Sequence, residues 1–145
     1  MSIHLNRKKI LCISFFLCCV LPAFFTWFDC DAVSMSGSSM LEVPLLIGTT
    51  LFAFALLFEH PGYILPLGIS SHLLLLAFFA NAFLSFPVIS GMSDAYDLSL
   101  SFSAAGSTFW IAVVLLTVHL GLFTTTEIAV RRLIKHSSAQ CNSNH

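Results

Sequence analysis

Residues 63–89 read YILPLGISSHLLLLAFFANAFLSFPVI and contain no Asp, Glu, Lys or Arg. The hydrocarbon core of a bilayer is about 30 Å thick, and a helix of about 20 apolar residues crosses it. The stretch is longer than this minimum, so it can cross a membrane with some tilt. It therefore predicts a transmembrane helix.

Three further stretches of the same character surround it. They cover residues 10–28, 41–58 and 104–129, and their only charged residues are Glu42 and Glu127, which lie near the ends of their stretches. Each must form a helix, since an isolated strand in lipid leaves backbone groups without hydrogen-bond partners. The runs also lack the alternation of barrel strands. We expect an all-α integral membrane protein, a bundle of four transmembrane helices.

The composition agrees with this fold class. Of the 145 residues, 57% are hydrophobic and 9% are charged, where soluble domains have roughly 25% charged residues. The net charge of -1 offers no basic face to phosphates, so nucleic-acid binding is not expected. We expect residues 1–145 to form one domain with short tails at 1–9 and 130–145.

Orientation follows from the positive charges, because Lys and Arg near span ends stay on the cytoplasmic side. All of them precede the first span or follow the fourth: Arg7, Lys8, Lys9, Arg131, Arg132 and Lys135. With four spans both groups lie on one side. We expect a multi-pass protein of the plasma or inner membrane with both termini in the cytoplasm.

Residues 1 to about 30 have an alternative interpretation as a cleaved signal peptide, because a basic start before an apolar run is typical of both. The apolar run 10–28 is longer than the usual core of a signal peptide, and no clear small-x-small cleavage site follows it. We therefore favour a retained first span.

Two outer loops and one inner turn connect the predicted spans. EHPG at 59–62 contains two helix breakers and predicts a tight turn. In the second outer loop, 90–103, Leu98, Leu100 and Phe102 alternate with serines, which is typical of a strand. We expect this loop and the first, 29–40, to pair as a small sheet or hairpin, the alternative being flexible polar loops.

The layout of four spans with two outer loops resembles that of claudin-type tetraspan proteins, with Trp27 and Cys30 at the exit of the first span. Claudins carry a longer first loop with further Trp and a Cys pair, whereas this loop has a single Cys and no other Trp. The resemblance is one of layout, and we infer no family from it. Trp27 and Trp110 are expected to anchor the bundle near the outer interface.

His72 and His119 are the most informative residues inside the predicted spans, because ionisable groups at membrane depth are rare and need partners. Each lies about nine or ten residues from the cytoplasmic end of its span, so their depths are similar. Structural hydrogen bonding, with Ser71 or Thr117 as local partners, is the favoured interpretation. The alternatives are haem ligation by two opposed imidazoles and a proton or metal relay.

Other polar and small residues in the spans are expected to pack helices together. Asn81 is interpreted as an interhelical hydrogen-bonding residue, and Thr117, Gly121 and Thr125 form a row that allows close helix approach, most simply within the bundle. Three of the five cysteines lie inside the first span, and we expect them to behave as small apolar packing residues: Cys12, Cys18 and Cys19.

Function is the least constrained property. No carboxylate lies at the centre of a span, no cysteine pair faces the outside, and no hydrolase motif occurs. We therefore expect a non-enzymatic accessory, assembly or interaction protein, without a cofactor or metal, whose partners are the lipid bilayer and other membrane proteins or a second copy of itself. The alternative is an intramembrane protein that handles haem, a solute or protons through His72 and His119.

Overall fold

The computed structural model describes residues 2–30, 33–57 and 61–142, and most of them are helical. In chain order the elements are α1 (Ser2–Phe15), the π-helix η1 (Phe16–Val20), the 3-10 helix η2 (Leu21–Phe24), β1 (Thr26–Cys30), β2 (Val33–Ser36), α2 (Gly37–Leu57), α3 (Pro61–Ile89), α4 (Leu98–Ala104) and α5 (Ser107–Asn142).

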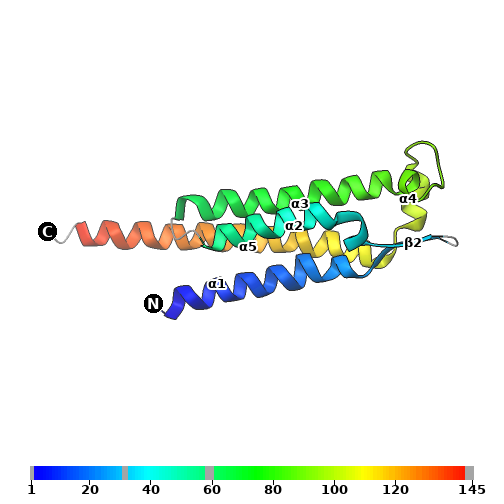
Figure 1. The fold of residues 1–145 in the computed structure, drawn as a ribbon. Helices are drawn as coiled ribbons and strands as arrows, with labels where there is room; N and C mark the ends of the chain where they lie inside the picture. Colours follow the sequence, from blue (N-terminus) through cyan, green and yellow to red (C-terminus); the bar gives the residue numbers. More distant parts are fainter. Residues whose placement is uncertain (1, 31–32, 58–60, 143–145) are drawn as a thin grey trace.

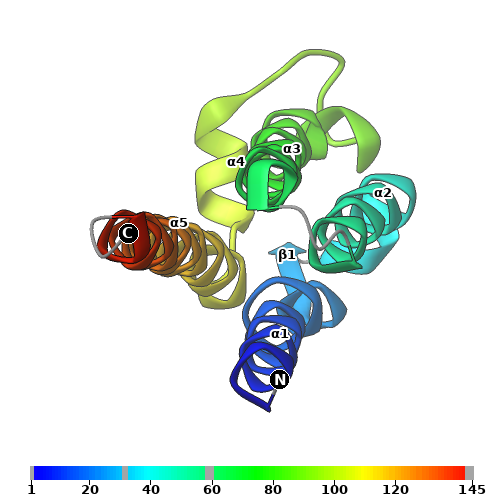
Figure 2. The same cartoon turned by 90° about the vertical axis from the view of Figure 1, so that its left-hand side faces the viewer.

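Four helical segments lie side by side as one bundle. In Figure 1 the segments that begin with α1, α2, α3 and α5 run lengthwise, with both chain termini toward one end and α4 and the strands at the other. Seen along the bundle, α1, α2, α3 and α5 follow one another around a common axis (Figure 2), and each contacts its two neighbours. The chain therefore runs up and down through the bundle.

Two of these helices are long and apolar enough to cross a membrane, at Gly62–Ile89 and Ser107–Lys135. In α2 the corresponding apolar part, Val43–Leu57, is shorter. The first segment changes from α-helix through η1 to η2, where Pro22 lacks the N–H that a continuing α-helix would need. Two candidate spanning helices are thus observed within the described residues.

Many large apolar side chains lie on the surface of the bundle, while several polar side chains are inside. Exposed residues on α5 include Ile111, Val114, Val118 and Leu122. The buried polar and charged residues are Ser71, His72, Ser101, His119 and Glu127. A helix that is apolar on every face is typical of a membrane span, because lipid replaces water around it. The exposed apolar surface therefore agrees with membrane association.

The ends of two predicted spans are wrong. The predicted span 10–28 leaves the helix at Phe25, whose backbone is extended, and the chain then enters β1. The helix that corresponds to the predicted span 104–129 is α5. It begins three residues later than predicted, at Ser107, because α4 occupies the chain up to Ala104, and it continues well beyond residue 129. The turn predicted at 59–62 lies partly outside the described residues, which leave out 58–60.

The small sheet is a local hairpin, in which β1 pairs with β2 in antiparallel register. The strand expected at Leu98, Leu100 and Phe102 is wrong, since these residues lie in helix α4. Just outside the two loops, Phe28 and Ala105 form an isolated bridge, beside which the Gly106 N–H donates to the Trp27 carbonyl at 2.8 Å. Within the described residues, the expected sheet between the two loops is therefore replaced by a hairpin of β1 and β2.

Asp97 explains why a helix replaces the predicted strand. Its carboxylate accepts hydrogen bonds from the backbone N–H groups of Ser99 and Leu100, at 2.9 and 3.2 Å, and so caps the first turn of α4. The Ser99 hydroxyl also donates to it at 2.7 Å. The alternating pattern could not reveal this helix, since capping depends on the residue before it.

This cap predicts a pH dependence of α4. The hydrogen bonds from Ser99 and Leu100 lower the pKa of Asp97 below its ordinary value. The stabilisation is therefore complete above the pKa of the unfolded chain and is lost as the pH falls through the lower folded pKa. We expect hydrogen-exchange protection of the α4 amides to fall in that range. Asp97→Ala should show reduced protection already at neutral pH and little further loss as the pH falls, while Asp94→Asn in the same loop should behave as wild type.

A cluster of aromatic rings fills the bundle at the end that carries the strands. Trp27 is fully buried, with ring centroids 4.6 Å from Phe79 and 5.5 Å from Phe109, and its indole N–H donates to the Pro22 carbonyl at 2.9 Å. The expectation that Trp27 anchors at an interface is therefore wrong, because a strand turns its ring inward. Trp110 is partly exposed on α5.

Candidate functional site: a buried histidine pair

His72 of α3 and His119 of α5 are in direct contact inside the bundle. His72 Nε2 lies 2.7 Å from His119 Nδ1, and the two ring planes are within 11° of each other. Both residues are buried, with 0% and 3% of their surfaces exposed. The two ring nitrogens therefore share one hydrogen.

The hydrogen-bonded chain continues on both sides of the pair. His72 Nδ1 lies 2.6 Å from the carbonyl of Gly68, so this nitrogen must donate. His119 Nε2 lies 3.0 Å from Ser14 Oγ of α1, and that hydroxyl also lies within donating distance of the Leu11 carbonyl, at 3.1 Å. Three helices thus contribute to a chain of donors and acceptors.

The single hydroxyl hydrogen of Ser14 gives this chain two complete arrangements. When both imidazoles are neutral, His119 Nδ1–H donates to His72 Nε2, and Ser14 donates to His119 Nε2. When the pair holds one additional proton, His119 Nε2–H donates to Ser14, whose hydroxyl turns to the Leu11 carbonyl. Every ring nitrogen has a partner in both arrangements, so neither leaves a buried polar group unsatisfied.

Aromatic rings enclose the pair. Phe15 and Phe52 stack on each other with centroids 4.0 Å apart, and both present edges to the two imidazoles. The ring of Phe123 covers His72 at a centroid distance of 5.7 Å. This apolar shell lowers the local dielectric constant, which strengthens the hydrogen bonds within the chain.

Cys19 of η1 brings a third ionisable side chain to this place, and it is also buried. Its Sγ and one ring nitrogen from each histidine all lie within 4.8 Å of one another. Sequence reasoning treated Cys19 only as a packing residue. Its depth in the span is the signal that could have found it. Cys19 lies about ten residues after Lys9, and each histidine lies at a similar number of residues from the cytoplasmic end of its own span.

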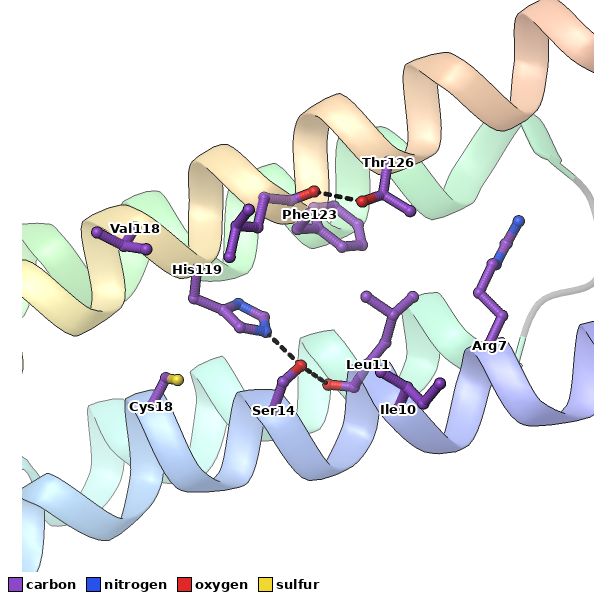
Figure 3. A pocket seen from close by; sticks show the side chains of 10 residues that line it. Arg7, Ile10, Leu11, Ser14, Cys18, Val118, His119, Phe123 and Thr126 are labelled. Atoms are coloured by element: carbon purple, nitrogen blue, oxygen red, sulfur yellow. Dashed lines mark hydrogen bonds between the residues drawn. The ribbon is translucent and has the colours of Figure 1, made fainter.

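A cavity of about 600 Å³ lies between α1 and α5 and reaches His119 of the pair. Figure 3 shows Ser14 and His119 pointing toward each other from the two helices, with Cys18 on one side and Arg7 on the other. The guanidinium of Arg7 forms an ion pair of 3.2 Å with the buried carboxylate of Glu127. Exposed apolar residues, among them Val118 and Leu122, also line the cavity, so it connects Ser14 and His119 with the surface of the bundle.

The local partners expected for the histidines are wrong. The Ser71 hydroxyl donates to the Gly48 carbonyl of α2 at 2.7 Å, and the Thr117 hydroxyl donates to the Val113 carbonyl of its own helix at 2.8 Å. Both hydroxyl hydrogens are therefore donated to backbone carbonyls and not to the histidine rings. The observed hydrogen-bond partners of the histidines are Ser14 and the Gly68 carbonyl, in place of Ser71 and Thr117.

The residues expected to pack helices together lie on the outside. Asn81 is exposed on α3, and Thr117, Gly121 and Thr125 are exposed on α5. A Cβ atom added to Gly121 would meet nothing within 4 Å. The row of small residues therefore faces outward in this bundle, and its expected role in helix packing stays a prediction.

Gly68 gives a stability prediction for the site. A Cβ atom added to it would overlap the ring of Phe123, which covers His72. We expect Gly68→Ala to destabilise the bundle by about 1–3 kcal/mol, since overpacking displaces side chains or backbone. Gly121→Ala is the matched control, and it should leave stability unchanged or raise it slightly. Unfolding in mixed micelles measures both, and equal losses would refute the close packing at Gly68.

Comparisons of the chain with protein-family models, with curated proteins and with solved structures found no match.

Proposed function

We propose that this chain is a multi-pass membrane protein that takes up and releases a proton at the buried pair His72 and His119. The observation that carries the proposal is the 2.7 Å contact between the two ring nitrogens. Histidine is suited to the role because an imidazole ring can bind and release a proton reversibly. In the same proposal four helical segments cross the bilayer and both termini are cytoplasmic.

In this proposal the proton enters through Ser14, which lines the cavity beside His119 and lies 3.0 Å from its Nε2. Ser14 passes its own hydrogen to His119 Nε2 and keeps the arriving proton, which turns to the Leu11 carbonyl. The added charge is then shared between the imidazoles through their common hydrogen. Because the chain ends at the Gly68 carbonyl, which cannot pass a proton on, the pair holds a proton and does not conduct it across the bundle.

Haem ligation fits this geometry less well. A metal ion bonded to two imidazoles lies about 2 Å from each nitrogen. The two ring nitrogens are 2.7 Å apart, their rings are almost parallel, and three phenylalanine rings pack against them. A porphyrin between the imidazoles would have to displace these rings. The contacts therefore support proton binding over the haem alternative.

Nuclear magnetic resonance of the ¹⁵N-histidine-labelled protein tests the proposal. We expect a far-downfield resonance from the shared hydrogen, and a change in the ring-nitrogen shifts of His72 and His119 as the pH falls. His72→Gln and His119→Gln should each abolish the downfield resonance, while Asn81→Gln, an exposed change on α3, should preserve it. Constant ring-nitrogen shifts of the pair between pH 4 and 8 would show that its hydrogen bonds are purely structural.

Topology requires a separate experiment. Reporter fusions after Lys135 and within residues 33–39 should report opposite sides of the membrane, with the carboxyl-terminal fusion in the cytoplasm. The positive charges at both ends of the chain support this orientation. A carboxyl-terminal fusion on the outside would refute the even number of spans.

A second candidate function is that of a non-enzymatic accessory or assembly protein. The exposed row Thr117, Gly121 and Thr125 supports it, because small residues on an outward face let another helix approach closely. The partner would be another membrane protein or a second copy of the chain. Crosslinking in membranes tests this role: Gly121→Leu should reduce association, while Leu122→Ala, the adjacent position, should not.

A further inference from the structure

We propose that Cys19, His72 and His119 form a binding site for one monovalent copper ion. The three ligand atoms come from η1, α3 and α5, are all buried, and lie within 4.8 Å of one another. This goes beyond the proton binding proposed above: it uses the same two histidines, but it also requires Cys19, which has no part in the proton chain.

The hydrogen bonds around the histidines already suit metal ligands. His72 Nδ1 is directed at the Gly68 carbonyl, which leaves Nε2 as the ligand atom. His119 Nε2 faces Ser14, which leaves Nδ1 as the ligand atom. In protein metal sites the second imidazole nitrogen is usually held by a carbonyl, carboxylate or water in this way, which fixes the ring and its tautomer. Both histidines have such a partner.

The ligand atoms need only a small movement to accept an ion. Two nitrogens bonded to one metal ion at about 2 Å, with an angle near 110–120° between the bonds, lie roughly 3.3–3.5 Å apart. Their present separation is 2.7 Å. The rings must therefore move apart by less than about 1 Å. Sγ of Cys19 already lies within 4.8 Å of them.

Charge and ligand number select the ion. One thiolate and two neutral imidazoles carry a single negative charge, so a monovalent ion gives a neutral centre, whereas Zn²⁺ would leave a net charge among phenylalanine rings. Structural zinc sites also take four ligands, and three are found here among the described residues. Thiolate ligands favour Cu(I), and three-coordinate sites of one Cys and two His are known for copper. The site therefore suits Cu(I) best.

The proton balance of binding is simple. The Cys19 thiol loses its proton when it becomes a ligand. His119 keeps one hydrogen, which moves from Nδ1 to Nε2 and is then donated to Ser14. Binding therefore releases one proton in total, and no electron is transferred.

The cavity between α1 and α5 supplies an entry path. Cys18 and Ser14 line it, and His119 lies at its inner wall. Cys18 is partly exposed and directly precedes the buried Cys19. A thiol at the cavity wall offers a soft ligand to Cu(I) on its way to the site.

Competition with a chromogenic Cu(I) chelator tests the site in the purified full-length protein, kept reduced and free of oxygen. We expect one tightly bound Cu(I) per chain, with one sulfur and two nitrogen ligands by X-ray absorption. Cys19→Ser should weaken binding more than about tenfold, as should His72→Gln. Cys12→Ser, a change at an exposed cysteine of α1, should have no effect.

The same variants separate this proposal from proton binding. Cys19→Ser should lose Cu(I) but keep the downfield resonance of the shared hydrogen, which also shows that it is folded. Ser14→Ala should still bind one Cu(I), although more weakly, and should lose proton uptake. Undiminished Cu(I) affinity in Cys19→Ser, coordination by sulfur alone, or tight binding of Zn²⁺ in preference to Cu(I) would overturn the copper site.

Discussion

Trp27→Ala is expected to lower the free energy of unfolding by about 3–5 kcal/mol, the range found when a large buried aromatic residue is truncated. Its ring is fully buried between Phe79 and Phe109, and a Cβ atom added to Gly37 would overlap it. The truncation leaves a cavity where the β1 and β2 hairpin joins the helices. Unfolding in mixed micelles measures the loss.

Two control variants separate ring burial from other effects. Trp110→Ala removes a ring of the same size that is partly exposed on α5, so this change should lower the free energy of unfolding much less. Trp27→Phe keeps most of the buried area but loses the hydrogen bond to the Pro22 carbonyl, which should cost about 1 kcal/mol. Equal losses in the two alanine variants would contradict the buried position of Trp27.

The helices could be predicted from the sequence because their apolar runs are long. The predicted range 63–89 differs from α3 (Pro61–Ile89) by two residues at its start. The predicted range 10–28 failed at its end because hydropathy does not distinguish a helix from a buried strand: Trp27 and Phe28 are apolar, but they belong to β1. Hydropathy reports the surroundings of a residue and leaves its backbone conformation open.

The histidine pair could be predicted in part. Counting residues from the span ends placed His72 and His119 at similar depth, and their direct contact confirms this. Which other side chains face the pair depends on how each helix is rotated about its own axis. That rotation is set by the packing of the helices, which counting residues along the sequence does not give. Ser14 and Cys19 were therefore not predicted as members of the site, although their depths agree with it.

The exposed row on α5 shows why polarity is a poor guide to packing in this chain. The hydroxyls of Thr117 and Thr125 donate to carbonyls one turn earlier in their own helix, at 2.8 and 2.9 Å. A threonine satisfied in this way has no polar group that needs a partner helix. Small and hydroxylated residues can therefore face outward, while ionisable groups such as His119 cannot.

The ion pair of Arg7 and Glu127 should give the second large effect. The side chain of Glu127 is 3% exposed and that of Arg7 18%, and they connect α1 to α5 beside the cavity, which Arg7 lines. Arg7→Leu leaves a buried carboxylate without this partner, and removal of one member of a buried pair costs about 3–5 kcal/mol. Arg131, one turn after Glu127, lies on the same helix face and reduces the loss to the lower part of that range.

A double-mutant cycle in mixed micelles tests the ion pair. Arg7→Leu and Glu127→Leu should each destabilise the protein, whereas the double variant should be more stable than the sum of the two losses predicts, because two apolar side chains of similar size need no ionic partner. Lys8→Leu is the matched control, since Lys8 neighbours Arg7 and lies outside the pair. Strict additivity in the cycle would mean that the contact contributes nothing to holding α1 against α5. The cavity that leads to His119 would then owe its shape to apolar packing alone.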